Sequence, residues 1–215
     1  FMEVSSHAVV QHRVAGITFA GGGFTNITHE HLDFHKTFKE YIDVKKSFFD
    51  HLGPNAIALT NADDKNGAVM LQNTQATKYT YALKSPSDFK GKIIENELSG
   101  LILQINGTEL YTQLIGEFNG YNLLAVFGIA QLLELDKLEV LTQMSTLKSV
   151  DGRFEFFKSE GNVTCIVDYA HTPDALENVL KTILSFKKVN TKVLTILGCG
   201  GDRDKTKRPK MAAIA

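Results

Sequence analysis

The strongest constraint on the fold lies in the last quarter of the chain, where two apolar segments flank a helix-like one. Residues 163–168 read Val-Thr-Cys-Ile-Val-Asp, and residues 192–197 read Lys-Val-Leu-Thr-Ile-Leu. Pro173 stands between them, where proline can open a helix. Two buried strands joined by a helix predict a βαβ unit, which builds a parallel sheet covered by helices. We therefore expect an α/β fold, divided into domains at 1–170 and 171–215.

The preceding residues alternate in the same way. Helices are expected at 8–14, 31–52 and 122–135, and strands at 57–61 and at 16–26, the latter interrupted by Gly21, Gly22 and Gly23. Between residues 77 and 115, short β patterns are separated by Ser85-Pro86 and Asn106-Gly107. The second pair is a hairpin signal, so we expect a small antiparallel excursion there.

Charge and cysteine usage exclude several classes of protein. The formal net charge of −1 implies no broad attraction to nucleic acid or to an anionic membrane. No apolar run approaches the length of a membrane span. Cys165 and Cys199 lie far apart in apolar runs. We expect them to be free, buried thiols in a reducing compartment and not a disulfide or a metal site.

Two polar segments are candidates for ligand binding near the N-terminus. Residues 26–35 hold three histidines and two carboxylates, and His31 and His35 are one helical turn apart. The glutamate of the His-Glu-x-x-His zinc pattern is not in place, so the segment is either a metal site or a solvated helix start. Glu3, before Ser5-Ser6-His7, is either a ligand at the edge of a parallel sheet or an incidental acid beside a helix cap.

A third candidate follows the last apolar segment. Residues 198–208 combine a Gly-rich turn with Arg203, Lys205, Lys207 and Arg208. Glycines let a phosphate approach the backbone and cations neutralise its charge, so the segment is either an anion site or a solvated basic loop. The chain contains no Gly-x-x-x-x-Gly-Lys-Ser/Thr phosphate loop.

Several blocks, taken in order, resemble the Mur ligase family, and within it the members that form the tripeptide. They are Met-Glu-Val-Ser-Ser-His (2–7), Gln-His-Arg (11–13), Phe-Thr-Asn (24–26), His-Leu-Asp-Phe-His (31–35), Phe-Asn-Gly-Tyr-Asn-Leu-Leu-Ala (118–125), Asp-Gly-Arg-Phe-Glu (151–155), Asp-Tyr-Ala-His-Thr-Pro-Asp-Ala-Leu (168–176) and Gly-Cys-Gly-Gly-Asp-Arg-Asp-Lys (198–205). The resemblance implies a central ATPase-type domain, with a mostly parallel sheet, over 1–170. It implies the start of a Rossmann-like C-terminal domain over 171–215. We expect the chain to begin inside the central domain, after its phosphate loop.

The reaction implied by this resemblance is ATP-dependent amide formation. A diamino acid, meso-diaminopimelate or L-lysine, is added to UDP-MurNAc-L-Ala-D-Glu through an acyl phosphate. Both steps bring anions together, so charge neutralisation should dominate catalysis. The complete protein is expected to be cytoplasmic and monomeric, and the 215-residue chain alone to be inactive. Two alternatives stay open: a catalytically silent folded module, and a ligase similar to folylpolyglutamate synthetase.

The resemblance also assigns roles to individual residues. Glu3, His31 and a carbamylated Lys45 would hold Mg²⁺, which prefers oxygen ligands. Local sequence alone places Lys45 and Lys46 on a solvated helix face. The remaining roles are substrate binding by Ser5, Gln11 and Arg13, adenine binding by Asn119 and Asn122, phosphate binding by Arg153 and ribose binding by Asp168.

Overall fold

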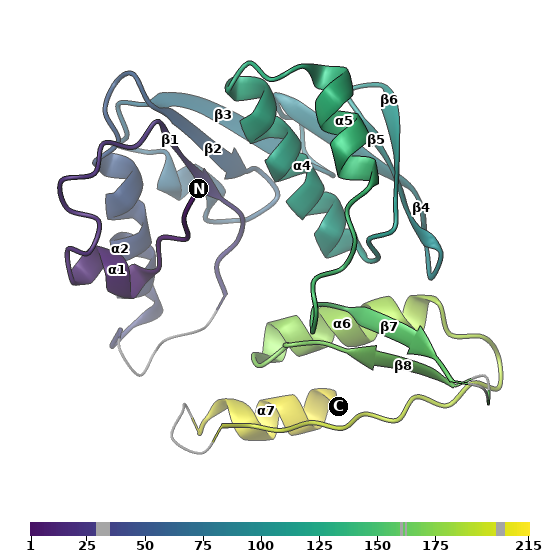
Figure 1. Ribbon diagram of the computed structural model, residues 1–215. Helices are drawn as coiled ribbons and strands as arrows, with labels where there is room; N and C mark the ends of the chain where they lie inside the picture. The colour runs from purple at the N-terminus through teal and green to yellow at the C-terminus, as the bar shows by residue number, and fades with distance from the viewer. Residues whose placement is uncertain (29–34, 160, 162, 201–204) are drawn as a thin grey trace.

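The computed structural model spans residues 1–215 and describes all of them except 29–34, 160, 162 and 201–204. Its main sheet contains β1 (Gly21–Phe24), β2 (Ile57–Asn61), β3 (Thr77–Ala82), β4 (Phe89–Glu97), β5 (Gly100–Ile105) and β6 (Thr108–Thr112). The helices beside it are α1 (Ser6–Val10), α2 (Phe38–Asp50), α3 (Gly67–Met70), α4 (Glu117–Leu132) and α5 (Lys137–Ser145). The C-terminal part holds β7 (Glu155–Lys158), β8 (Thr164–Val167), α6 (Pro173–Ser185) and α7 (Lys207–Ile214), which lie together in Figure 1.

The main sheet is parallel at one end and antiparallel at the other. Its strands lie in the order β1-β2-β3-β4-β5-β6; the first three pairings are parallel and the last two antiparallel. Asn106 and Gly107 join β5 to β6 with φ of 44° and 85°, the positive values that a two-residue hairpin turn needs. The predicted mixed sheet and hairpin are confirmed. The antiparallel part starts only at β4, later than expected, because β3 pairs parallel to β2.

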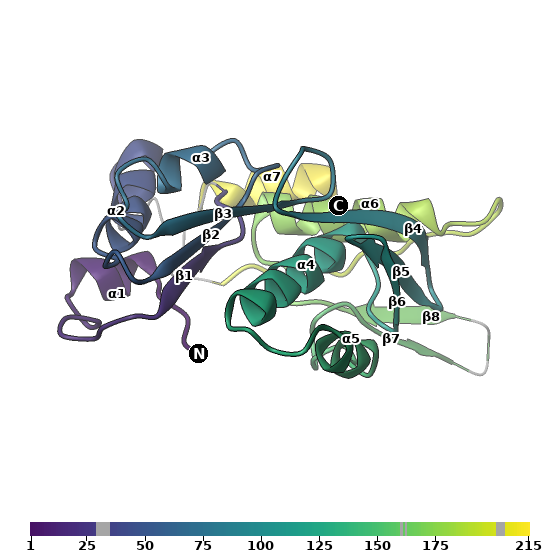
Figure 2. The same cartoon turned by 90° about the horizontal axis from the view of Figure 1, so that it is seen from above.

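Helices bury both faces of the parallel part, as Figure 2 shows with α2 and α3 on one side and α4 on the other. Neighbouring residues of β2 point into different cores. Ala58 belongs to the cluster with Phe49 of α2, and Leu59 to the cluster with Phe127 of α4. Because successive side chains of a strand face opposite sides, a strand buried on both faces reads as a continuous apolar run.

The glycines at 21–23 form a strand and do not interrupt one, so that prediction was wrong. They make β1 thin enough for close packing on both faces. A Cβ on Gly22 would lie 2.7 Å from a ring carbon of Phe48 in α2. A Cβ on Gly23 would lie 3.3 Å from Ile129 in α4. Glycine in a strand interior often marks such a close approach.

Helix boundaries differ from the predicted ones where caps decide them. The helix expected at 31–52 begins at Phe38, because Thr37 is its N-cap and accepts a hydrogen bond from the Glu40 amide at 3.1 Å. The Glu40 carboxylate in turn accepts from the Lys36 amide at 3.1 Å. A Thr-x-x-Glu pattern is a known helix start, so the sequence contained this signal. α1 likewise begins at Ser6, capped by Ser5, and α4 at Glu117, both earlier than expected.

The predicted parallel βαβ unit is not formed at the C-terminus. β8 pairs antiparallel with β7, and its residues are exposed or half-buried. Residues 191–200 form no strand, and Leu194 and Ile196 are 90% and 101% exposed, so no neighbouring strand covers this segment. A strand needs a partner for its backbone groups, which apolar sequence alone does not supply.

Two smaller expectations also meet the structure here. α6 starts at Pro173 as predicted, with Thr172 as its cap. The cysteines are free, as expected, but they are not buried: Cys165 is half-buried and Cys199 exposed. Among the described residues, no helix combines the length and apolar character that a membrane crossing requires.

Phe127 should carry much of the stability of the α4 face. It is 1% exposed and packs edge to face on Phe89, with ring centroids 6.2 Å apart. Phe127→Ala should lower the free energy of unfolding by about 3–5 kcal/mol in urea titrations, since it leaves a cavity. Val126→Ala, on the next residue of α4 and 51% exposed, is the matched control. Equal losses in the two variants would contradict the assigned core.

Candidate functional site

The loops at the carboxyl ends of β1, β2 and β3 are tied together by side chains from the last residue of β2 and from the loop after it. The Asn61 side-chain amide donates to the Thr25 carbonyl at 3.0 Å. The Asp64 carboxylate accepts from the Ile27 amide at 3.2 Å. Ligands of open α/β sheets bind at this carboxyl edge, so these bonds fix the loops that would surround a ligand.

Asp63 is the centre of this edge. Its carboxylate accepts hydrogen bonds from the amides of Leu83, Lys84 and Ser85, each at 2.8 Å, and from the Tyr121 hydroxyl at 2.9 Å. Burial opposes ionisation, but these hydrogen bonds outweigh it and hold the pKa of Asp63 far below its usual range. Sequence reasoning missed this residue. Two acids soon after a buried strand were the signal.

A second set of contacts brings α1 and α2 together; we call it the α1–α2 corner (Ser5, Ser6, His35, Tyr41 and Lys45). Ser6 and His35 are each 1% exposed, and the Ser6 hydroxyl lies 2.8 Å from His35 Nε2. The His35 ring stacks on Tyr41 with centroids 5.1 Å apart. Lys45 Nζ lies 5.4 Å from the Tyr41 ring centroid. The corner therefore joins the segment that holds Ser5 to Lys45.

Tyr41 and Lys45 meet because they are four residues apart on α2. A cation above a tyrosine ring is attracted by the negative face of the ring. This contact holds the Lys45 side chain against the Tyr41 ring of the corner.

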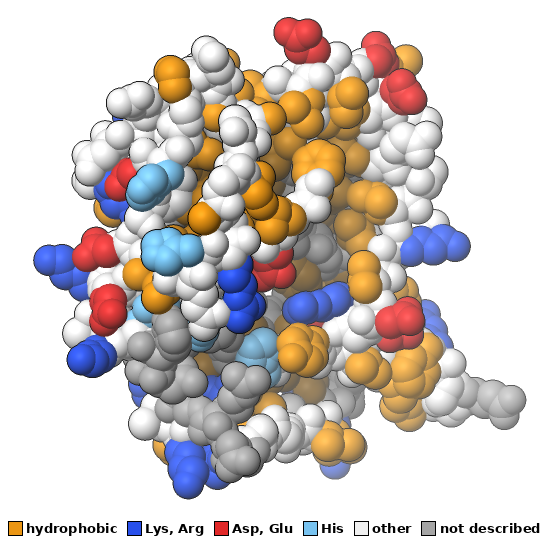
Figure 3. Space-filling model, turned by 60° about the vertical axis from the view of Figure 1, so that its left-hand side comes forward, with side chains coloured by type: hydrophobic (Ala, Val, Ile, Leu, Met, Phe, Trp, Pro, Cys, Tyr) orange, Lys and Arg blue, Asp and Glu red, His pale blue; other side chains and the backbone are white. Residues whose placement is uncertain are grey.

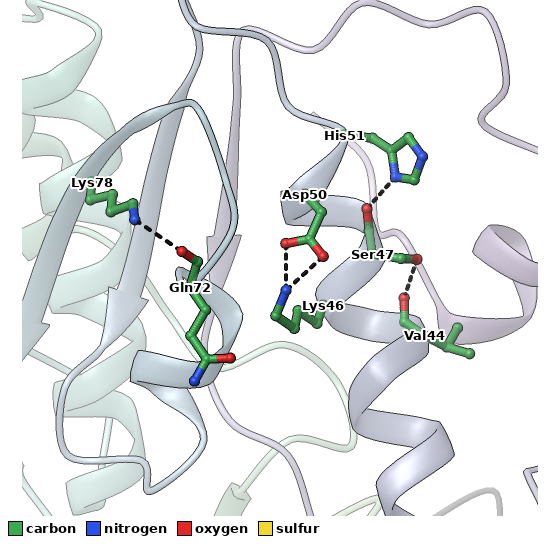
Figure 4. A network of polar contacts seen from close by, with 7 residues as sticks. All are labelled: Val44, Lys46, Ser47, Asp50, His51, Gln72 and Lys78. Atoms are coloured by element: carbon green, nitrogen blue, oxygen red, sulfur yellow. Dashed lines mark hydrogen bonds and ion pairs between the residues drawn. The ribbon is translucent and has the colours of Figure 1, made fainter.

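The neighbouring lysine has a different environment. Lys46 is 8% exposed, and its ammonium lies 2.7 and 2.6 Å from the two carboxylate oxygens of Asp50 (Figure 4). The expectation of a solvated Lys45-Lys46 face was therefore wrong for Lys46, and Lys45 is half-buried. Successive helix residues point about 100° apart, so one lysine serves the packing of α2 and the other faces the corner.

Three further predicted residues lie around α1. Glu3 is exposed before the helix, Gln11 is its C-cap, and Arg13 is exposed just after it. His31 lies outside the described residues. Within the described part of the chain, no group of three or more histidine, cysteine or acidic side chains could hold a metal ion. The Mg²⁺ ligand set therefore stays a prediction.

The predicted adenine-binding residues share one face of α4. The Asn122 side-chain amide donates to the Asn119 side-chain oxygen at 3.3 Å. The Asn119 side-chain amide donates to the Ile115 backbone carbonyl at 2.8 Å. Phe118, the residue before Asn119, packs on Phe154, with ring centroids 6.0 Å apart. Since Phe154 follows Arg153, this contact brings the start of α4 next to the predicted phosphate-binding segment.

Asp168 is tied to the same segment. Its carboxylate accepts from the Phe154 amide at 2.8 Å and from the Ala170 amide at 2.7 Å. The Arg153 guanidinium lies over the Tyr169 ring at 5.0 Å. The structure therefore gathers all four predicted nucleotide-binding residues near Phe118 and Phe154. It also gives Asp168 a structural role that the sequence did not predict.

The basic segment after the last glycines contacts the same region. Lys207 Nζ donates to the His171 carbonyl at 2.7 Å, and Arg208 donates to the Gly200 carbonyl at 3.1 Å. These bonds join the 168–176 and 198–208 blocks, while residues 201–204 lie outside the described residues.

Figure 3, seen from the side of α1 and α2, shows acidic, basic and histidine side chains interspersed over that face. The anion site at 198–208 stays a prediction.

These features define an α/β protein whose candidate ligand groups lie at the carboxyl edge of a parallel sheet and beside a second, C-terminal part. The chain belongs to the Mur ligase family. Residues 1–130 match the Mur ligase middle domain, and residues 152–215 match the Mur ligase glutamate ligase domain. The division of the chain after residue 170 stays a prediction.

Relatives match the chain from end to end. It is 58% identical over 215 residues to the UDP-N-acetylmuramoyl-L-alanyl-D-glutamate–2,6-diaminopimelate ligase of Cytophaga hutchinsonii, covering 100% of this chain and 44% of the relative. It is 56% identical to the protein of the same name from Bacteroides thetaiotaomicron, of which it covers 45%. A solved structure of a ligase of that name superposes with a TM-score of 0.73 at 29% identity, covering 99% of this chain and 45% of that one. The chain thus spans less than half the length of these relatives.

Asp168→Ala should destabilise the C-terminal part, because it leaves two amide groups without their charged acceptor. We expect a loss of about 1–3 kcal/mol in the free energy of unfolding. Asp168→Asn keeps one side-chain oxygen as acceptor and should lose less. Chemical denaturation of both variants tests this. If the alanine variant is as stable as the parent chain, the two hydrogen bonds contribute nothing.

Proposed function

We propose that the protein carrying this sequence is an ATP-dependent ligase that adds 2,6-diaminopimelate to UDP-MurNAc-L-Ala-D-Glu. The observation that carries the proposal is the end-to-end match, at 58% identity, to a relative with that name. The sequence alone left diaminopimelate and L-lysine open, and the names of the relatives favour the former.

The proposed chemistry has two steps. The terminal carboxylate of the dipeptide attacks the γ-phosphate of ATP, which forms an acyl phosphate and releases ADP. The amine of the incoming amino acid then attacks the acyl carbon and releases phosphate. Fixed positive charges and hydrogen-bond donors should stabilise the anionic groups in both steps.

In this proposal the chain's residues divide into two groups. Asn119 and Asn122 bind the adenine from α4, while Arg153 and Asp168 serve the phosphates and ribose. Asn119 follows Phe118, Arg153 precedes Phe154, and Asp168 accepts from the Phe154 amide. The Phe118–Phe154 contact therefore links the three residues, which supports one nucleotide site. Asp168 would have to serve the ribose while its carboxylate also holds two backbone amides.

The second group surrounds the α1–α2 corner and would serve the peptide substrate. Ser5, Gln11 and Arg13 lie at the two ends of α1 or just beyond it. Glu3, just before this helix, offers a carboxylate, and a carbamylated Lys45 would offer a second oxygen donor. Those are the ligands that Mg²⁺ prefers, and the ion would neutralise phosphate charge. The described residues alone do not complete the coordination of the ion.

The ligase proposal is tested with a protein of the relatives' full length that contains this sequence. ADP release should require ATP and UDP-MurNAc-L-Ala-D-Glu together with diaminopimelate. L-lysine in place of diaminopimelate, and a folate with glutamate, are the comparison substrates. Turnover with the folate would favour the folylpolyglutamate synthetase alternative. Absence of turnover with every substrate set would favour the silent module.

Lys45→Ala in that protein should nearly abolish turnover, because the oxygen ligand formed when the neutral amine captures CO₂ would be lost. Added short-chain carboxylic acids should restore part of the rate by supplying the missing carboxylate. The measurement is ADP release with and without acetate. Lys39→Ala, an exposed lysine of the same helix, is the control and should behave as the parent. Full turnover in Lys45→Ala would refute the carbamate role.

A further inference from the structure

Helix α4 begins without a side-chain cap. Gly116 occupies its N-cap with φ of 98°, and no side chain caps the first turn. The Gly116 amide is bound instead by the Asn96 side-chain oxygen at 2.9 Å. A helix start that lacks a local cap depends on contacts from other segments for its position. Asn119 and Asn122, the proposed adenine contacts, lie within the first two turns.

Besides Asn96 and Phe154, two contacts from the carboxyl edge of the sheet hold this part of α4. The Tyr121 hydroxyl donates to the Asp63 carboxylate at 2.9 Å, in the loop after β2. Lys84 pairs with Glu117 at 2.8 Å, from the turn after β3. Asp63 also binds the backbone of that turn through the amides of Leu83, Lys84 and Ser85. One carboxylate therefore joins the sheet edge, the turn after β3 and α4.

The two contacts differ in strength. Both partners of the Lys84–Glu117 pair are largely exposed, and such pairs contribute little. The Tyr121–Asp63 hydrogen bond is partly buried and has a charged acceptor, which makes it stronger than a neutral one. Tyr121 lies about 100° around the helix from Asn122. The bond to Asp63 therefore ties the turn of α4 that carries Asn122 to the loop after β2.

The neighbouring acid, Asp64, binds a different segment, the one after β1. Asp64 binds the Ile27 amide, in the segment after β1 that leads toward the His31 block. Adjacent carboxylates of one loop thus reach different segments: Asp63 binds Tyr121 of α4, and Asp64 binds the segment after β1.

We propose that Asp63 and Tyr121 are positioning residues for the nucleotide: they orient Asn119 and Asn122 through α4 without contacting the substrate themselves. The inference rests on the ligase function proposed above. Neither residue was singled out by the sequence, and neither belongs to the groups assigned to substrate or metal.

The test uses Tyr121→Phe in the protein of the relatives' full length, a change that removes one hydroxyl and keeps the ring. KM for ATP should rise about three- to tenfold, less than the full loss of a hydrogen bond to a charged group, because Tyr121 acts on the nucleotide only through α4, while kcat and KM for the amino acid change little. Asp64→Asn should raise KM for the UDP-linked dipeptide more than KM for ATP. Tyr111→Phe, which removes a similar hydroxyl bond to Glu109 on β6, should change neither.

Amide hydrogen exchange provides a readout that does not depend on turnover. In Tyr121→Phe, exchange over 117–122 should become faster than in the parent, with α5 unchanged. Should Tyr121→Phe not fold, Glu117→Gln at the exposed pair should show the same pattern to a smaller extent. An unchanged KM for ATP in folded Tyr121→Phe would overturn the inference and leave a purely structural role. A parent enzyme that needs no ATP would instead overturn the proposed function.

Discussion

Burial of the parallel strands on both faces is the constraint on which the rest of the structure depends. β2 sends Ala58 into one core and Leu59 into the other, and neither side chain is exposed by more than 1%. A sheet covered on both sides can present polar groups only at its edges and strand ends. The carboxyl ends of β1, β2 and β3 are therefore where Asn61, Asp63 and Asp64 can reach the neighbouring loops and α4.

Local patterns predicted those elements whose signals lie within a few residues. The strand at 57–61, the Asn106-Gly107 hairpin and the helix opening at Pro173 were all predicted correctly. The failures were non-local. Residues 192–197 have the composition of a strand, but none of the strands in the described part of the chain pairs with them. The glycines of β1 were expected to interrupt a strand, because the packing of Phe48 that requires them comes from a helix further along the chain.

The candidate site was predictable only in part, for the same reason. Residue roles at Ser5, Lys45, Asn119 and Asp168 came from ordered blocks that resemble a family, and local chemistry would not have found them. The structure adds the contacts between those blocks: His35 between Ser6 and Tyr41, and Phe118 against Phe154. It also separates Lys45 from Lys46, whose partner Asp50 lies four residues further on. Asp63 escaped prediction because its partners are about 20 and 58 residues away in the chain.

The three glycines of β1 weaken the side-chain signals that fix its register against β2. A strand keeps its alignment with its neighbours because a slip of one residue would move every side chain to the wrong face. Gly21, Gly22 and Gly23 carry no side chains, so a slip along them would misplace nothing of their own. Phe24, 5% exposed in the α2 core, is the one side chain in β1 that marks the correct alignment. The alignment of β1 therefore depends on this one phenylalanine, while Thr25 and Ile27 of the segment that follows are held by hydrogen bonds to Asn61 and Asp64.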